Sequence, residues 1–304
     1  MLSRFSLFPL VLLFAAALAG CRSAPESFAS PQDAVDALHQ AVASDDQSRL
    51  RAILGPRMDE LKSGDQAQDR ADFVAFASKL GERTQIQPAG DNEAILLIGA
   101  EAWPFPAPLV QEGGRWSFDT DAGITELNNR RIGADELAII DACYAYIDAQ
   151  AEYHAINWND GGPPSYAAHL ASSPGTRDGL YWPTAEGDPP SPLGPVMAAA
   201  MPSEAPGDPP SPFYGYIFLP LSRQGASAPG GAMDYVQDGR LIRGFAAAAF
   251  PAEYGRSGIM TFIFSADGVV YQRDLGPQTA AIVAAMTEFN PDEGWEPVSP
   301  ADPQ

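Results

Sequence analysis

The chain has 304 residues, of which 45% are hydrophobic, so it has enough apolar material for one or two cores and lacks the composition of a disordered protein. Its net charge of −21 comes from 39 acidic and 18 basic residues. A surface of this sign repels nucleic acid and anionic lipid headgroups, because both are bound through clustered cations. We therefore do not expect the protein to bind nucleic acid.

Residues 1–20 have the layout of an export signal. Arg4 provides a positive charge, residues 7–18 form an almost unbroken apolar run, and small residues lead up to a cysteine. This run is short for a bilayer span. The sequence Leu18-Ala-Gly-Cys21 resembles the bacterial lipobox, which implies removal of residues 1–20 and acylation of Cys21. An ordinary signal peptide and an N-terminal anchor helix are the alternatives.

The residues that follow Cys21 bear on where such a lipoprotein resides. In the lipoproteins that it resembles, an aspartate directly after the lipid-bearing cysteine favours retention in the inner membrane, whereas this chain has Arg22 there. The resemblance implies a protein of the bacterial cell envelope that is lipid-anchored to the outer membrane and faces the periplasm. Residues 21–30 contain Pro25 and few apolar side chains, so we expect a tether between lipid and fold.

Residues 31–125 are expected to form a first domain of helices followed by an antiparallel sheet. Ser30 and Pro31 are a helix-start signature, and the apolar residues after them recur at helical spacing. Beyond the third helix the pattern changes to that of strands, and Gly113-Gly114 joins the last two as a hairpin. This order resembles the cone-shaped fold of the nuclear-transport-factor-like superfamily. The expected elements are helices at residues 31–42, 50–54 and 69–80 and strands at 84–87, 94–98, 109–111 and 115–119.

Residues 126–298 are expected to form a second domain, a long helix packed on an antiparallel sheet, so that the whole chain is α+β. Apolar residues recur three or four apart from near Asp135 to about His154. A turn at Asp267-Gly268 joins the last two strands. The arrangement resembles the head of type IV pilins and pseudopilins, without their directly joined apolar N-terminal helix. After a loop-rich stretch at 157–211, strands are expected at 214–221, 241–250, 258–265 and 269–274, then a helix from 277 and a tail at 299–304.

Several short motifs together resemble one bacterial family of exported proteins over nearly all of the chain after Cys21. They include Leu127-Asn-Asn-Arg-Arg-Ile-Gly133 and Arg177-Asp-Gly-Leu-Tyr-Trp-Pro183. The family is DUF2950, a domain family of unknown function, so the resemblance implies no activity, cofactor or catalytic residue. The remaining motifs lie at residues 173–176, 191–195, 251–255, 257–262 and 270–277.

The search for catalytic and metal-binding motifs assigns no catalytic residue, metal ligand or cofactor. No nucleophile elbow, zinc-protease helix or phosphate-binding loop is present in the sequence. His154, Asp160 and His169 are close enough in sequence for a metal or acid–base cluster, but their spacing matches no ligand pattern. Residues 157–161 suit either a calcium loop or a turn. Cys143 lies among apolar residues and is expected to be buried.

Aromatic and charged residues of the second domain are the main candidates for a binding site. Aromatic rings beside carboxylates suit sugar or peptide stacking, and a bacterial envelope offers both. The alternative is that the rings plug the sheet face and anchor a long loop. A proline-rich hexapeptide at 187–192 recurs at 207–212, as either a stiff spacer or a docking ligand. The candidate cleft comprises Arg177, Asp178, Tyr181, Trp182, Tyr214, Tyr216, Glu253 and Tyr254.

The function expected from these features is that of a non-enzymatic binding or scaffold protein of the envelope. Its partners would be the membrane, through the lipid, and an envelope protein or cell-wall polymer. One alternative is a hydrolase that uses Asp178 and Glu253 on an envelope polymer, which requires the two carboxyl groups to lie within about 5–10 Å. Another is an assembly factor for a pilus or secretion apparatus, which the pilin-like head favours.

Overall fold

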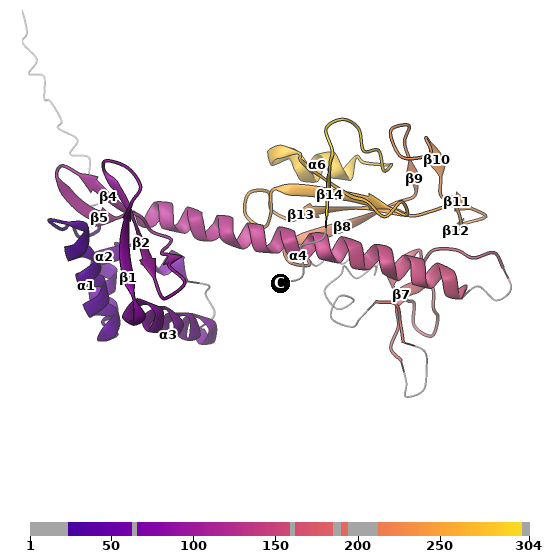
Figure 1. The fold of residues 1–304 in the computed structure, drawn as a ribbon. Coiled ribbons are helices and arrows are strands. Elements are labelled where there is room, and N and C mark those ends of the chain that lie inside the picture. Colours follow the sequence, from indigo (N-terminus) through magenta and orange to yellow (C-terminus); the bar gives the residue numbers. More distant parts are fainter. Residues whose placement is uncertain (1–23, 63–65, 159–161, 185–189, 194–211, 300–304) are drawn as a thin grey trace, which may run out of the picture. The chain divides into compact units, whose positions relative to one another are not determined.

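The structure is a computed structural model that describes residues 24–62, 66–158, 162–184, 190–193 and 212–299. The chain folds into two compact units, Met1–Leu127 and Asn128–Gln304. Each unit combines helices with an antiparallel sheet, so the predicted α+β class is confirmed (Figure 1). Among the described residues, we find no helix with the length and apolarity that a membrane crossing requires.

The first unit begins with three helices and one short 3-10 turn. Ser30 caps the first helix, since its hydroxyl accepts a hydrogen bond from the Asp33 amide at 3.2 Å, and Pro31 occupies the first position as predicted. Leu38 on this helix and Leu50 and Ile53 on the second are almost fully buried. The elements are α1 (Pro31–Ala43), α2 (Gln47–Leu54), η1 (Met58–Leu61) and α3 (Gln66–Glu82).

An antiparallel sheet completes the first unit. The strand order is β1-β2-β4-β5, and β3 also pairs with β2. Gly113 and Gly114 have φ angles of 57° and 80°, which suit the tight turn predicted between the last two strands. Leu96, Ile98 and Leu109 face the helices and are nearly inaccessible to solvent. The strands are β1 (Thr84–Pro88), β2 (Glu93–Ile98), β3 (Trp103–Pro104), β4 (Leu109–Glu112) and β5 (Arg115–Phe118).

The segment before α1 belongs to the fold instead of forming the free tether expected over residues 21–30. Phe28 is 8% exposed, and it exchanges backbone hydrogen bonds of 2.7 and 2.9 Å with Trp116 on β5. Glu26 pairs with Arg49 through both carboxylate oxygens, and its amide donates to the Ala52 carbonyl. The buried Phe28 ring and the contacts of Glu26 together fix this segment to the fold despite its polar composition.

Helix α4 (Thr120–Ile156) has 37 residues and begins well before the predicted start near Asp135. The Asp119 carboxylate accepts a hydrogen bond from the Ala122 amide at 2.9 Å, which satisfies one of the free amides at the helix start. Apolar spacing becomes regular only after this region, so the pattern alone placed the start too late. In the second unit, α4 buries Ile139, Cys143 and Tyr146 against the sheet.

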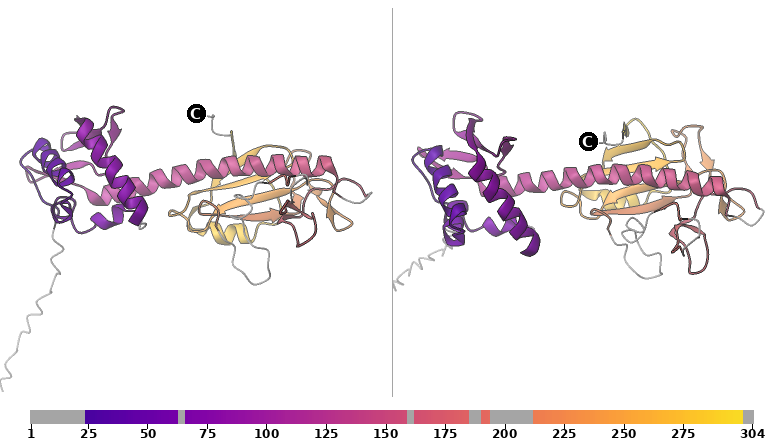
Figure 2. Two further views of the ribbon diagram at one scale, coloured as in Figure 1. Left: turned by 90° about the horizontal axis from the view of Figure 1, so that it is seen from below. Right: turned by 60° about the horizontal axis from the view of Figure 1, so that its bottom comes forward.

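The sheet of the second unit has the antiparallel order β16-β15-β14-β13-β8 and is covered on both faces. Ala247 and Ala249 of β13 face α4, whereas Ala246 and Ala248 face the layer that contains α6 (Figures 1 and 2). The predicted strand at 241–250 is divided, because the ladder starts only at Ala246. The elements are β8 (Tyr216–Leu221), β13 (Ala246–Pro251), β14 (Met260–Ser265), β15 (Val270–Asp274), β16 (Glu296–Val298), η2 (Gly276–Gln278) and α6 (Thr279–Ala284).

Short two-stranded ribbons border this sheet. A parallel pair lies within the predicted loop-rich stretch, and Gly179 of this pair packs tightly on the Ala171 backbone. Two antiparallel pairs follow β8. The ribbon strands are β6 (His169–Ala171), β7 (Gly179–Tyr181), β9 (Arg223–Gln224), β10 (Met233–Asp234), β11 (Val236–Gln237) and β12 (Arg240–Leu241).

Candidate functional site

One part of the expected cleft lies near the C-terminal end of α4. The Arg177 guanidinium stands 4.4 Å from the centre of the Trp158 ring and 5.5 Å from that of Trp182. The Tyr153 hydroxyl donates to the Arg177 carbonyl at 2.6 Å. Trp182 is only 5% exposed and packs with Tyr181 in the core. Its ring therefore anchors the loop and offers little surface on which a sugar could stack.

Asp178 is committed to its own loop. Its carboxylate accepts hydrogen bonds from the Ser173 amide at 2.8 Å, the Ser173 hydroxyl at 2.9 Å and the Thr176 hydroxyl at 2.6 Å. Partial burial raises the pKa of Asp178, but these hydrogen bonds outweigh it, so the pKa is lowered overall. The carboxylate is thus held ionised as a turn-forming group.

The other part of the cleft lies around the first residues of β8. Tyr216 is fully buried, its hydroxyl donates to the Met260 carbonyl at 3.0 Å, and burial raises its pKa. The Tyr254 hydroxyl donates to Asp274 at 3.2 Å, and Glu253 pairs with Arg256 at 3.2 Å. Of the eight candidates, Tyr214 is the large ring that remains well exposed, at 54%.

Contacts with α4 show that the two parts do not meet. Arg131 of α4 donates to the Arg256 carbonyl, in the turn that carries Glu253, whereas Tyr153 of α4 holds the loop of Arg177 and Asp178. At about 1.5 Å of rise per residue, these two points on the helix are roughly 30 Å apart. The structure therefore brings no paired carboxylates together from Asp178 and Glu253, and the predicted cleft is not formed.

The other sequence candidates also have structural roles or lie outside the description. His154 stacks on Tyr166 at 4.5 Å, and His169 lies on β6, while Asp160 is outside the described residues. No cluster of three or more metal-ligating side chains occurs in the part of the chain that the structure describes. Asn157 has a φ of 52° and donates to the Gly162 carbonyl, as in a turn. Cys21, residues 187–189 of the first proline-rich hexapeptide and residues 207–211 of the second lie outside the described residues, and Cys143 is fully buried.

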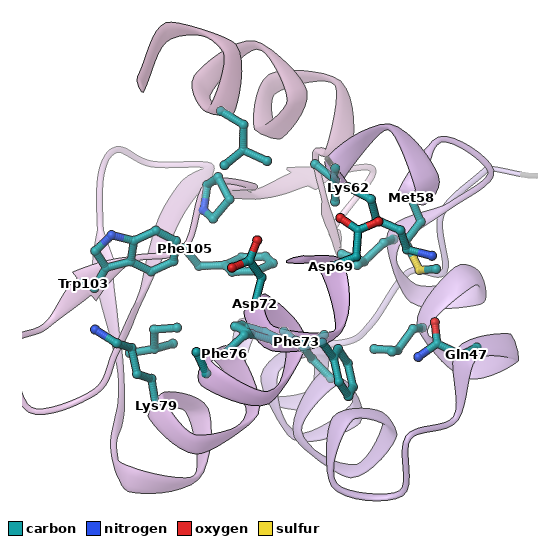
Figure 3. A pocket seen from close by; sticks show the side chains of 18 residues that line it. Gln47, Met58, Lys62, Asp69, Asp72, Phe73, Phe76, Lys79, Trp103 and Phe105 are labelled. Carbon is teal, nitrogen blue, oxygen red and sulfur yellow. The ribbon is translucent and has the colours of Figure 1, made fainter. Parts of the chain in front are cut away.

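A concave site also lies in the first unit, at residues that no sequence motif pointed to. It is a cavity of about 460 Å³, referred to below as the N-terminal pocket (Figure 3). Helices α1, α2 and α3, the turn η1 and the segment after β3 all contribute to its wall. The apolar lining residues are Leu38, Leu50, Leu54, Met58, Leu61, Phe73, Ala75, Phe76, Ile98, Trp103, Phe105, Pro106 and Leu127, and the polar ones are Gln47, Lys62, Asp69, Asp72 and Lys79.

Few side chains of helix α3 are buried, so the face of this helix that lines the pocket stays accessible. Phe73 and Phe76 lie on one helical face and are only partly covered, and Leu80 is the fully buried residue among its described side chains. Phe76 stacks on Phe105 at 5.5 Å, and Phe105 meets Phe118 edge-on at 5.7 Å. Through these contacts, the aromatic part of the pocket wall continues into the hydrophobic core of the first unit.

Four of the side chains that line the pocket are charged: Lys62, Asp69, Asp72 and Lys79. Lys62 pairs with Asp59 at 2.9 Å and Lys79 with Glu101 at 3.4 Å, so both ammonium groups face acidic neighbours. Asp69 and Asp72 project from α3 beside the aromatic rings (Figure 3). An apolar interior with a polar rim binds ligands by burying their apolar part and leaving a polar end in water.

Sequence signals for this pocket existed but were incomplete. Phe73, Phe76 and Leu80 recur at helical spacing within the predicted helix at 69–80, and Trp103-Pro-Phe-Pro106 places two aromatic rings next to prolines. That these groups surround a cavity depends on how α3 packs, which no local pattern specifies. A second cavity of about 360 Å³ is lined by Tyr181, Trp182, Pro183, Thr184, Pro190, Ser191 and Leu193.

Comparisons with known proteins place the chain in a family without assigning an activity. No curated protein and no solved structure matches it. The model of a family described as "Protein of unknown function (DUF2950)" matches residues 25–298, which is most of the chain and includes both folded units. The chain therefore belongs to the DUF2950 family.

Proposed function

We propose that the protein is a non-enzymatic binding protein of the bacterial envelope, whose N-terminal pocket holds the apolar part of a ligand. Lipid on Cys21 would anchor it to the outer membrane on the periplasmic side. The observation that carries the proposal is the pocket itself, since a cavity of about 460 Å³ falls within the range of about 300–1,000 Å³ that is usual for ligand sites.

The chemistry of the wall supports an apolar ligand over a cell-wall polymer. Phe73, Phe76 and Trp103 are only partly covered and offer aromatic surface, whose burial contributes about 25 cal/mol per Å². Sugars, by contrast, need exposed ring faces and many hydrogen-bonding groups, and the candidate rings Trp182 and Tyr216 are buried. The partner class favoured here is an envelope component with an acyl chain or another apolar group.

A dye-binding experiment tests this proposal. The full chain with Cys21→Ser is titrated with a dye that fluoresces in apolar surroundings, such as N-phenyl-1-naphthylamine. Ala75 is a small residue of the pocket wall, so Ala75→Trp should fill the cavity and weaken dye binding several-fold.

The matched control is Val74→Trp, because Val74 directly precedes Ala75 in α3, is 54% exposed and does not line the pocket. Dye binding by this variant should equal that of the parent. If both variants bind dye as the parent does, or if the parent binds none, the pocket is not a ligand site.

A further inference from the structure

The point at which the chain enters the fold lies next to the N-terminal pocket. Gly55 has a φ of 80°, and a β-carbon placed there would lie 2.9 Å from the Pro25 ring. Pro25 therefore packs directly on the residue that ends α2. Leu54, just before this residue, and Met58, three residues after it, both line the pocket.

The segment between Pro25 and the pocket wall is fixed by several contacts. Glu26 is held on the outer side of α2 by Arg49 and the Ala52 carbonyl, while Leu50 and Leu54 on the same helix face the pocket. From Glu26 towards the N-terminus, the chain therefore runs to Pro25, which lies at the C-terminal end of α2. Its entry point cannot move away without breaking the Glu26 contacts.

Little chain separates this entry point from Cys21. Three residues stand between Cys21 and Pro25, which span at most roughly 14 Å when fully extended. The wall residues Leu54 and Met58, on either side of Gly55 in the sequence, therefore stay within reach of a flexible hydrocarbon chain that is attached to Cys21. A covalently attached chain so near its site has a high effective concentration compared with a free ligand.

We infer that one acyl chain on Cys21 occupies the N-terminal pocket of the same molecule. This inference rests on the proposed function, both for the lipid on Cys21 and for the binding capacity of the pocket. A chain in the bilayer leaves the exposed part of the pocket wall hydrated, whereas a chain in the pocket removes Phe73, Phe76 and Trp103 from water as well. The remaining acyl chains keep the protein on the membrane.

Photocrosslinking of the protein's own lipid tests the inference. Cells that express the full chain are fed a fatty acid with a diazirine and an alkyne, and the protein is purified in detergent and irradiated. We expect crosslinks from modified Cys21 to peptides that contain Met58, Phe73 or Phe76. Ala75→Trp should lower their yield several-fold, and Val74→Trp should not.

Crosslinks that reach only lipid, detergent or other proteins would overturn the inference, as would absence of label from Cys21. Dye binding distinguishes this failure from that of the proposed function. If the Cys21→Ser chain binds dye and Ala75→Trp weakens this binding, the pocket is still a ligand site, but for a molecule other than the protein's own lipid. If the inference holds, the acylated protein should also bind less dye than Cys21→Ser.

Discussion

Replacing Phe28 by alanine tests whether the fold begins before α1. The ring is 8% exposed and packs in the first core, and its backbone pairs with Trp116. Truncation of a buried phenylalanine to alanine costs about 3–5 kcal/mol, and we take about 3 kcal/mol here because the residue lies near a chain end. In a domain of roughly 100 residues this corresponds to a fall in Tm of roughly 12–24 °C.

Differential scanning calorimetry of the full chain measures the effect. Two units give two transitions when they unfold independently, and only one of them should move. Ala29→Ser is the control, since Ala29 is exposed and surface changes usually stay within about 0.5 kcal/mol. If Phe28→Ala has no larger effect than Ala29→Ser, residues 26–30 are a tether after all and the reasoning on the entry point fails.

Four further predictions concern other residues. Cys21→Ser should abolish labelling by a palmitate analogue, and Arg22→Asp should move the protein toward the inner membrane on a density gradient; equal label on both proteins, or an unchanged distribution, would contradict the anchor or its sorting. Burial raises the pKa of Asp178, but the hydrogen bonds of its loop lower it by more, so the pKa in the folded state lies below the unfolded value. The ionised Asp178 carboxylate therefore stabilises the fold above about pH 4, and this stabilisation is lost as the pH falls through the lowered native pKa. Asp178→Asn should thus destabilise the protein at pH 7 and much less at pH 2, and equal losses in urea titrations at both values would refute this. Cys143 is fully buried and burial raises its pKa, so with Cys21→Ser in place iodoacetamide should modify it only after unfolding; modification in the native protein would show that it is accessible.

Local signals in the sequence predicted much of the secondary structure. The cap at Ser30 and the turn at Asp267-Gly268 depend on a few neighbouring residues, and the structure has both. The start of α4 was missed because Asp119 caps a helix whose first turns lack regular apolar spacing. The resemblances to the nuclear-transport-factor-like fold and to pilin heads stay predictions.

The candidate site was less predictable because it depends on packing between distant segments. Trp182 and Tyr216 have the residue types of a binding platform, yet both are buried when the sheet is covered by α4. The N-terminal pocket, in turn, depends on the stacking of Phe76 on Phe105, while Phe73 on the same helix stays only partly covered. Neither the residue type nor the spacing of an aromatic side chain in the sequence predicts whether it stays exposed to solvent after folding.

The alanine run of β13 makes this strand a partition between two cores. Successive side chains of a strand point to opposite faces, so Ala247 and Ala249 belong to the core under α4, and Ala246 and Ala248 to the core under α6. Because all four are at most 2% exposed, neither layer has room for a larger group there. Large side chains in one core can therefore be replaced without contact with the other core, as long as the four positions of β13 between them remain alanine.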